Sequence, residues 1–208
     1  MLPPVYPILD SASILKHGLG LVEAAEALLE GGAQILQLRH KEFWSKDVVA
    51  AAQKIADLCT QSQAMFVVND RADIAALTGS GLHIGQDDLM PEDARRVIGV
   101  NSLLGFSTHN DGQMRAAQSE PVDYFAFGPV FSTVSKARPD PTAGIDGLRA
   151  ARAFTSKPLV AIGGITRDNA GACWDAGASS VAVIADLIPV PCTRRALRER
   201  MAEWRRLR

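Results

Sequence analysis

The stretch MFVVNDRADIAALTGSGLHI, residues 65–84, contains one complete structural repeat of the chain. Two short, mostly apolar runs at 65–69 and 81–84 flank a segment at 72–77 whose apolar residues recur at helical spacing. A strand, a helix and a second strand in this order predict a parallel β-α-β unit, because the helix returns the chain to the start of the sheet. Polar residues follow both strands directly, so we expect them at the same edge of the sheet.

The same alternation runs along the whole chain in eight strand–helix pairs. Strands are expected at Val5–Leu9, Gln34–Arg39, Met65–Asn69, Gly81–Ile84, Leu103–Ser107, Tyr124–Gly128, Leu159–Ile162 and Val181–Ile184. Helices are expected at Leu21–Glu30, Lys46–Thr60, Ala72–Leu77, Pro91–Ile98, Asp111–Ser119, Ile145–Phe154, Asp168–Ala176 and Thr193–Arg206. Eight units in 208 residues favour an α/β fold with a single (β/α)8 TIM barrel domain over residues 1–208. An open, doubly wound sheet is the alternative.

Composition places the chain among ordinary globular proteins, with 47% hydrophobic and 22% charged residues. A net charge of −1 provides no overall field that would favour nucleic acid or an anionic membrane as a partner. No apolar run reaches the roughly 18 residues of a membrane helix, and the N-terminus lacks the pattern of a signal peptide. Three widely spaced cysteines predict reduced thiols, so a cytoplasmic location is expected.

A row of polar side chains ends the second predicted strand. Side chains alternate between the two faces of a strand, so Gln37, Arg39 and Lys41 share one face, while Leu36 and Leu38 point towards the helices. Burial of two unpaired cations would be costly, which favours an anionic ligand at the barrel mouth. The alternative is a row of strand-end residues held in salt bridges.

Carboxylates follow the next two predicted strands. Asp70 lies in the sequence Asn69-Asp70-Arg71, and Asp88 comes shortly after the fourth strand. Two carboxylates from neighbouring strands can hold Mg²⁺, which with the nearby cations suggests a magnesium-bound diphosphate. The alternative for the first motif is a helix N-cap with a local ion pair. His83 has no accompanying cluster of metal ligands, so we expect a core or ring-stacking histidine.

A second anion site is expected after strands seven and eight. The pair Gly163-Gly164 ends strand seven and permits close approach of backbone N–H groups to a phosphate. The segment 129–144 has no strand or helix pattern, which suggests a lid carrying the further cation Lys136; a tolerated surface insertion is the alternative. Two anion sites side by side indicate transfer of a group between two phosphorylated small molecules.

From Tyr6 to about Ile188 the chain resembles the thiamine-phosphate synthase family. The motifs that carry the resemblance are Gln37-Leu38-Arg39-His40-Lys41, Asn69-Asp70-Arg71, His83-Ile84-Gly85-Gln86-Asp87-Asp88, Gly105-Phe106-Ser107, Gly128-Pro129-Val130, Thr133-Val134-Ser135-Lys136 and Gly163-Gly164-Ile165. Each motif is modest alone, but this order at successive strand ends is specific.

The resemblance implies that hydroxymethylpyrimidine diphosphate is coupled to a thiazole monophosphate, giving thiamine phosphate and diphosphate. Its implied magnesium ligands are Asp70 and Asp88. Its implied residues for the pyrimidine diphosphate are Gln37, Arg39, Lys41, Asn69, Ser107 and Lys136, and the catalytic ones among them are Arg39, Lys41, Ser107 and Lys136. Its implied contacts to the thiazole phosphate are Thr133, Ser135, Gly164, Ile184 and Ala185. The implied chemistry is dissociative: diphosphate leaves first, and the thiazole nitrogen captures the pyrimidine methylene cation.

Three positions depart from the family pattern. His40 replaces a usual acidic residue, Ser135 replaces a threonine but keeps the hydroxyl, and Ala185 replaces a common serine. Loss of that serine hydroxyl predicts weaker binding of the thiazole phosphate. A related subfamily isomerises the thiazole phosphate and carries a catalytic histidine where this chain has Pro129, so a tautomerase is one alternative. A non-catalytic barrel that binds phosphorylated ligands is another, and the oligomeric state stays open, with a homodimer among the possibilities.

Overall fold

A computed structural model, which describes residues 1–133 and 141–208, shows a closed barrel of parallel strands in the order β1 to β8. The strands are β1 (Val5–Asp10), β2 (Ile35–Arg39), β3 (Met65–Asn69), β4 (Gly81–Ile84), β5 (Leu104–Thr108), β6 (Tyr124–Phe127), β7 (Leu159–Ile162) and β8 (Ser180–Val183). The barrel closes where β1 pairs with β8, with Val5 opposite Val181. The expected barrel is therefore confirmed, and the open sheet is wrong.

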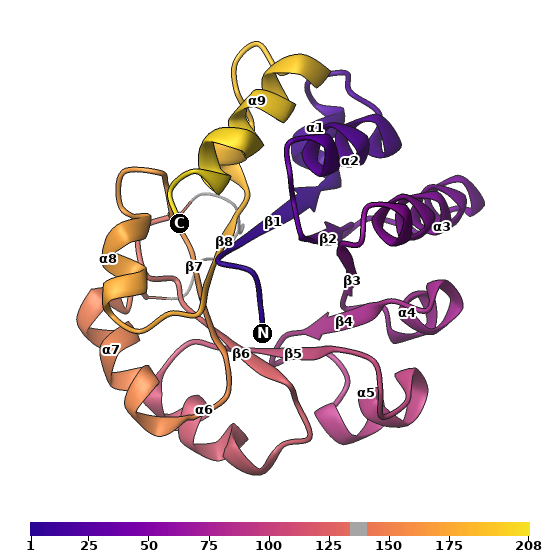
Figure 1. Cartoon of the computed structure of the whole chain (residues 1–208). Helices are drawn as coiled ribbons and strands as arrows, with labels where there is room; N and C mark the ends of the chain where they lie inside the picture. The colour runs from indigo at the N-terminus through magenta and orange to yellow at the C-terminus, as the bar shows by residue number, and fades with distance from the viewer. Residues whose placement is uncertain (134–140) are drawn as a thin grey trace.

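Helices surround the barrel as an outer ring (Figure 1). The α-helices are α1 (Ser11–Leu15), α2 (Leu21–Glu30), α3 (Lys46–Gln61), α4 (Ala72–Thr78), α5 (Pro91–Ile98), α6 (Asp111–Ala116), α7 (Gly144–Phe154), α8 (Ala170–Asp175) and α9 (Arg194–Arg205). Two 3₁₀-helices are η1 (Ala117–Ser119) and η2 (Ala185–Leu187). Within the described residues no helix is long and apolar enough to span a membrane.

Two helical segments were absent from the expected pattern, and the start of helix α8 differs from the expected one. The short α1 and η2 follow β1 and β8 directly, and each is too short to show a helical period. Helix α8 begins at Ala170 rather than at Asp168, because a turn precedes it in which the Asn169 side chain accepts a hydrogen bond from the Thr166 N–H at 2.8 Å.

The alternation of side chains along the strands produces two separate apolar layers. One layer lies between the strands and the helices and includes Leu36, Leu38 and Val68. The other fills the inside of the barrel and consists of Leu2, Tyr6, Ile8, Ile35, Val67, Tyr124, Ala126, Val160 and Ala182. The inner layer forms a packed floor, so a ligand has access only to the end of the barrel above it.

Gly105 makes room for the largest inward side chain. A Cβ atom at this position would lie 2.0 Å from Cζ of Tyr124, which is far inside contact distance. The glycine on β5 therefore lets the Tyr124 ring from β6 cross the barrel interior, where the ring is completely buried.

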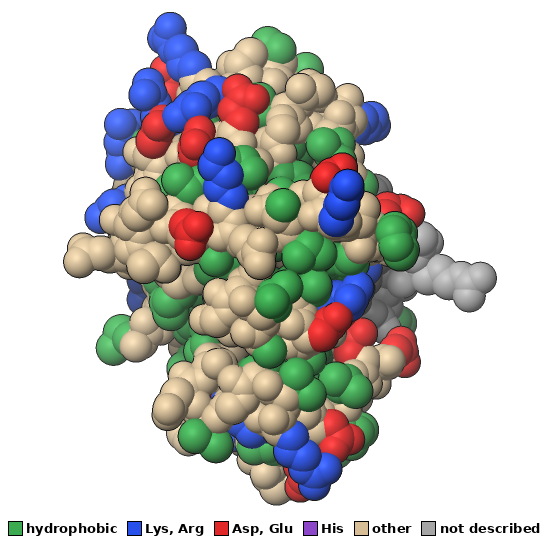
Figure 2. Space-filling model, turned by 90° about the vertical axis from the view of Figure 1, so that its right-hand side faces the viewer, with side chains coloured by type: hydrophobic (Ala, Val, Ile, Leu, Met, Phe, Trp, Pro, Cys, Tyr) green, Lys and Arg blue, Asp and Glu red, His purple; other side chains and the backbone are tan. Residues whose placement is uncertain are grey.

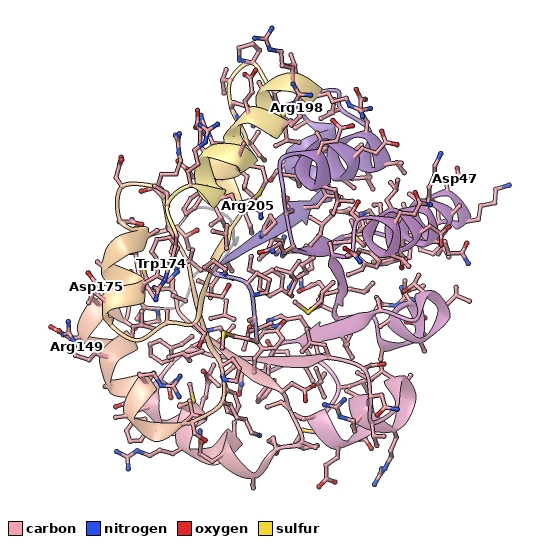
Figure 3. The ribbon with its side chains drawn as sticks, in the orientation of Figure 1. Asp47, Arg149, Trp174, Asp175, Arg198 and Arg205 are labelled. Atoms are coloured by element: carbon pink, nitrogen blue, oxygen red, sulfur yellow. The ribbon has the colours of Figure 1, made fainter. Side chains whose placement is uncertain are left out.

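Charged residues occupy the outside of the helix ring. Asp47 on α3 and Arg149 on α7 lie at its periphery and are exposed (Figure 3). Basic and acidic side chains are interspersed on the face seen in Figure 2, as expected for a net charge near zero. Helix α9 buries Leu197, Met201 and Trp204 and exposes arginines such as Arg195, Arg198 and Arg205 to solvent.

The packing of α2 into the core gives a test of the outer layer. Leu28 on α2 is 1% exposed within the core, so Leu28→Ala should lower the free energy of unfolding by about 2–5 kcal/mol through lost burial and a cavity. Leu77→Ala on α4, where the side chain is 58% exposed, should change it by less than about 0.5 kcal/mol. Urea denaturation of both variants measures the difference, and equal effects would contradict the packing described.

Candidate active site at the barrel mouth

A cavity of about 720 Å³ opens at the carboxyl ends of the strands. The residues expected at the site that line this cavity are Gln37, Arg39, Lys41, Asn69, Asp70, Asp88, Ser107, Thr133, Gly164, Ile184 and Ala185. Ser135 and Lys136 lie outside the described residues, as does the middle of the expected lid. The described candidates therefore come from seven different strand ends, those of β2 to β8, but share one space.

Arg39 reaches the cavity from the end of β2 and is paired across to β1. Its Nη1 donates to Oδ2 of Asp10 at 2.5 Å. The other carboxylate oxygen of Asp10 caps α1 by accepting from the Ser13 N–H at 3.0 Å and from the Ser13 hydroxyl at 2.6 Å. Burial alone would raise the pKa of Asp10, but the hydrogen bonds from Ser13 and the contact with Arg39 lower it. Asp10 does not line the cavity but holds Arg39 there, a supporting role that the sequence pattern missed because Asp10 resembles an ordinary strand end.

Lys41 is paired in the same way, with a carboxylate oxygen of Asp70 beyond the end of β3. The salt-bridge alternative for the polar row is thus partly correct, since both cations contact a carboxylate. Both cations also line the cavity, and about half of the Lys41 side chain is exposed. Each cation keeps further N–H donors with which it could contact an anion.

Asp70 and Asp88 interact with each other across the cavity wall. Burial raises the pKa of Asp70 above its usual value, Lys41 opposes this shift, and the charge and hydrogen bonding of Asp88 add to it. Asp88 itself accepts a hydrogen bond from the Gly85 N–H at 2.7 Å. Two neighbouring acidic groups repel each other when both are ionised, so the pair would gain from a bound cation.

The backbone at Asp70 has a left-handed conformation, with φ at 65°. Residues other than glycine seldom adopt this conformation, and Asp and Asn tolerate it best. Neither Asn69 nor Asp70 caps the following helix: the N-cap of α4 is Arg71, which makes no side-chain cap. The N-cap alternative is thus partly correct: the motif contains the N-cap residue, and Arg71 pairs locally with Asp73 at 2.5 Å, but no side chain of the motif caps the helix. The unusual turn instead points Asp70 towards Lys41.

Asn69 presents a hydrogen-bond donor without a partner. The residue is 7% exposed, and its Nδ2 makes no hydrogen bond with any described group. A buried amide N–H₂ group that remains unsatisfied costs free energy, so such a group indicates an acceptor that is supplied by a ligand. Asn69 lines the same cavity as Arg39 and Lys41, so an amide, a guanidinium and an ammonium donor surround one space.

A chain of buried polar side chains forms the floor of the cavity. Gln37 Nε2 donates to the Tyr6 hydroxyl at 3.1 Å, and the Tyr6 and Tyr124 hydroxyls are 3.0 Å apart. His83 stacks on Tyr124 and contacts its hydroxyl through Nδ1 at 2.9 Å, as well as the Ser107 hydroxyl through Nε2 at 2.9 Å. The ring-stacking expectation for His83 is confirmed. Neither tyrosine was expected at the site, because an aromatic residue in a strand resembles core.

Burial keeps both tyrosines in the neutral form. It raises the pKa of Tyr6 to about 12, against the opposing effect of hydrogen bonds from Tyr124 and Gln37. It also raises the pKa of Tyr124 well above the usual value, with a further contribution from Tyr6. Each hydroxyl therefore carries its proton at neutral pH and can donate a hydrogen bond.

The opposite side of the cavity contains a tight glycine turn after β7. Gly164 has φ at 63°, and a Cβ atom there would lie 2.3 Å from the carbonyl oxygen of Ser132. The Asn169 side chain donates to the Gly164 carbonyl at 3.1 Å, and the Phe131 N–H donates to the Gly163 carbonyl at 3.0 Å. The turn is thus fixed on both sides, as expected for a backbone that binds an anion closely.

An ion cluster ties the loops after β7 and β8 to the last helix. Arg167 Nε donates to Asp186 at 2.9 Å, and Arg167 also pairs with Glu203 on α9. Arg200 donates to the Asp186 backbone carbonyl at 2.7 Å and pairs with Glu203 at 3.2 Å. Asp186 lies in η2, directly after Ala185, so α9 supports the turn that borders the cavity.

His40, which departs from the family pattern, points away from the cavity. Its Nδ1 lies 2.7 Å from the Ser11 hydroxyl, and its ring meets Trp44 edge to face. The residue is buried, so it connects α1 with the loop that follows β2. Nothing in this position brings the imidazole to the residues lining the cavity.

The raised pKa of Asp70 predicts a pH dependence of stability. The folded state holds this proton more tightly than the unfolded chain, so stability falls as pH rises from the unfolded pKa of roughly 3.9 through the raised folded value. Asp70→Asn removes the titration and suits the left-handed backbone. The unfolding free energy of the variant relative to the natural chain should therefore increase from about pH 3.5 to 7 without divalent cations.

Asp73→Asn is the matched control for this measurement. A hydrogen bond from Arg71 lowers the pKa of Asp73, with a smaller opposing effect of burial, so this carboxylate stabilises the fold above its unfolded pKa. The relative stability of the control should fall slightly as pH rises, because Asp73 is largely exposed. A flat or falling curve for Asp70→Asn would contradict the arrangement of Asp70 and Asp88.

Comparisons with known proteins agree with the family suggested by the motifs. The sequence model described as thiamine monophosphate synthase matches residues 5–187. The chain is 45% identical over 202 residues to a thiamine-phosphate synthase of Koribacter versatilis, covering 93% of this chain and 92% of that one. It is 40% identical over 189 residues to a thiamine-phosphate synthase of Moorella thermoacetica, covering 89% and 90%.

Solved structures include a similar member of this family and a more distant protein with the same fold. A thiamine phosphate pyrophosphorylase from Pyrococcus furiosus superposes with a TM-score of 0.78 at 28% identity, covering 96% of both chains. A 2-keto-3-deoxy-6-phosphogluconate aldolase from Zymomonas mobilis superposes with a TM-score of 0.71 at 18% identity, covering 97% of this chain and 92% of that one, which shows a shared fold only. The chain belongs to the thiamine monophosphate synthase family and is a transferase.

Proposed function

We propose that the protein couples hydroxymethylpyrimidine diphosphate to a thiazole monophosphate, giving thiamine phosphate and diphosphate. The observation that supports this most strongly is one cavity with two chemically different ends. One end has cations, a carboxylate pair and the unpartnered Asn69 amide, and the other has the rigid Gly163-Gly164 turn. Such a cavity suits two phosphorylated substrates that must lie side by side.

Arg39, Lys41 and Asn69 would bind the diphosphate. Arg39 and Lys41 provide positive charge, and Asn69 provides the amide donor that has no partner among the described residues. Lys136, outside the described part of the chain, is proposed as a further cation, and Gln37 and Ser107 as neutral contacts. Neutralising the negative charge that develops on the leaving diphosphate is the main requirement of a dissociative transfer.

Asp70 and Asp88 would hold Mg²⁺ beside the diphosphate. Burial raises the pKa of Asp70 and the nearby Asp88 carboxylate adds to this shift, which fits a pair arranged for a divalent cation. No group of three or more histidine, cysteine or acidic side chains that could hold a metal occurs in residues 1–133 and 141–208. Two carboxylates complemented by water and phosphate oxygens are typical of magnesium sites. The ion would supply additional charge neutralisation for the leaving group.

The thiazole phosphate would bind at the turn after β7 and at the start of η2. Gly164 and Ala185 would contribute backbone N–H groups, and Thr133, Ser135 and Ile184 would complete the contacts. The fixed turn would orient the thiazole nitrogen towards the pyrimidine methylene carbon, and positioning of this kind lowers the barrier to group transfer.

The described side chains provide no activated nucleophile. A dissociative reaction does not need one from the enzyme, so this observation is compatible with the proposal. Ser107 and His83 form a serine–histidine pair that the sequence did not predict, but the third member is the hydroxyl of Tyr124 and not a carboxylate. A carboxylate normally supports the imidazole that takes a proton from a nucleophile. We therefore propose that Ser107 binds the substrate and does not attack it.

The direct test is formation of thiamine phosphate from the two substrates, with and without Mg²⁺. Magnesium-dependent product would support the proposed reaction and its metal. Isomerisation of the thiazole phosphate without coupling would support the tautomerase instead. Binding of both substrates without any turnover would support a non-catalytic barrel.

Removal of one carboxylate tests the magnesium assignment. Asp88→Asn should lower kcat/KM by about a hundredfold or more, because a direct ligand should matter at least as much as an outer-shell partner. The affinity for thiazole phosphate, measured by calorimetry, should change little, since that substrate binds at the other end of the cavity. Asp87→Asn is the matched control. Equal losses of turnover and of thiazole phosphate affinity in Asp88→Asn would contradict the magnesium assignment.

Restoring the usual serine tests the thiazole phosphate site. Ala185→Ser adds a hydroxyl at the start of η2, and a hydrogen bond to a charged phosphate should tighten binding about tenfold. Calorimetry with thiazole phosphate measures this change. Ala178→Ser, outside the cavity, is the control, and unchanged affinity in the first variant would remove residue 185 from the phosphate site.

A further inference from the structure

The hydrogen bonds of the buried polar chain on the cavity floor can all be assigned one donor-to-acceptor direction. It joins Gln37, Tyr6, Tyr124, His83 and Ser107, which come from five different strands. Four of these side chains are at least nine-tenths buried, whereas Ser107 is partly exposed at the cavity. All five side chains border the cavity, so the chain runs along its floor from the buried Gln37 to the partly exposed Ser107.

The direction begins at Gln37, whose amide nitrogen can only donate. The Tyr6 oxygen accepts this hydrogen bond, so the single hydroxyl proton of Tyr6 is available for the Tyr124 oxygen at 3.0 Å. Tyr124 then directs its own proton to His83 Nδ1 at 2.9 Å. With this assignment, each proton in this part of the chain is donated in the direction from Gln37 towards His83.

The histidine passes the direction on to Ser107. Since His83 Nδ1 accepts from Tyr124, the imidazole carries its proton on Nε2 and donates it to the Ser107 oxygen at 2.9 Å. A proton on Nδ1 would instead point Tyr124 back at Tyr6, and the buried Tyr6 proton would then have no acceptor in the chain. An unpaired buried hydroxyl of this kind is costly.

We propose that this chain fixes Ser107 as a hydrogen-bond donor to an anionic oxygen of the ligand, and that Tyr6, Tyr124 and His83 are positioning residues which act through Ser107. A serine hydroxyl can otherwise rotate to donate or to accept. Here the oxygen already accepts from His83, so its proton turns towards the cavity. A donor oriented before the ligand arrives needs no reorganisation when charge develops.

The inference rests on the proposed function, since the anionic oxygen would belong to the diphosphate group. It also gives Ser107 a defined part in that function. A nucleophilic serine must give its proton to the histidine, whereas His83 Nε2 is occupied by a proton of its own. The direction of the hydrogen bonds thus separates binding by Ser107 from attack by Ser107.

The first measurement needs no substrate. The chain has four histidines, so ¹⁵N NMR of histidine-labelled protein at neutral pH can resolve each ring, with His83→Asn identifying the signals of His83. We expect the tautomer protonated at Nε2, with an Nδ1 shift typical of an acceptor. Tyr124→Phe removes the hydroxyl but keeps the stacked ring, and it should alter the Nδ1 shift. A His83 protonated at Nδ1, or at both nitrogens, would overturn the proposal.

The second measurement is a double-mutant cycle with inorganic diphosphate and Mg²⁺ as the probe. Ser107→Ala and Tyr124→Phe should each weaken diphosphate binding by about three- to tenfold. The double variant should bind no more weakly than Ser107→Ala alone, because the tyrosine acts through the serine. Additive losses would overturn the coupling. Phe125→Leu, a buried change facing the helices, controls for general destabilisation and should leave binding unchanged.

The two measurements also separate this inference from the proposed function. If no thiamine phosphate forms while diphosphate binds and His83 has the expected tautomer, the proposed reaction fails and the oriented donor stands. If thiamine phosphate forms but His83 is protonated at Nδ1, or the losses in the double-mutant cycle are additive, only the oriented donor is overturned. Absence of any diphosphate binding to the natural chain would overturn both.

Discussion

Pairing of β1 with β8 is the constraint on which the rest of the molecule depends. A parallel barrel that closes in this way places every strand's carboxyl end on one rim, and the side chains of each strand alternate between the interior and the helices. Residues from distant parts of the sequence, such as Gln37, Ser107 and Gly164, then line a single cavity. The packed floor below them closes the other end, so the chemistry is confined to that rim.

The rim gathers groups that would be unfavourable if each stood alone. Asp70 combines a left-handed backbone with a raised pKa, and Asn69 has a buried donor that no described group satisfies. The two cations form ion pairs with carboxylates, Arg39 with Asp10 and Lys41 with Asp70. Unfavourable features of this kind concentrate at functional sites, where ligand binding relieves them.

Periodicity and strand-end position predicted the barrel and part of the cavity wall, whereas contacts such as Ser107, Ile184 and Ala185 were implied only by the family resemblance. The two-residue repeat placed Gln37, Arg39 and Lys41 on one face, and the glycine pair after strand seven marked the opposite wall. Tyr6 and Tyr124 could not be recognised in this way, since their roles arise from contacts across the barrel between residues 118 positions apart. Asp10 was missed for a similar reason: its partner Arg39 is on another strand, and α1 is too short to show a helical pattern.

The ion cluster of Arg167, Asp186, Arg200 and Glu203 gives the last helix a second function besides covering the barrel. Helix α9 follows all eight strands in the sequence, so during synthesis the barrel strands leave the ribosome before the helix that supports η2. The glycine turn and η2 would thus reach their final geometry only after the C-terminal residues have docked. In this sense the rim after β7 and β8 would be completed late in folding, and a chain truncated before Glu203 could form its sheet and still lack these supporting contacts.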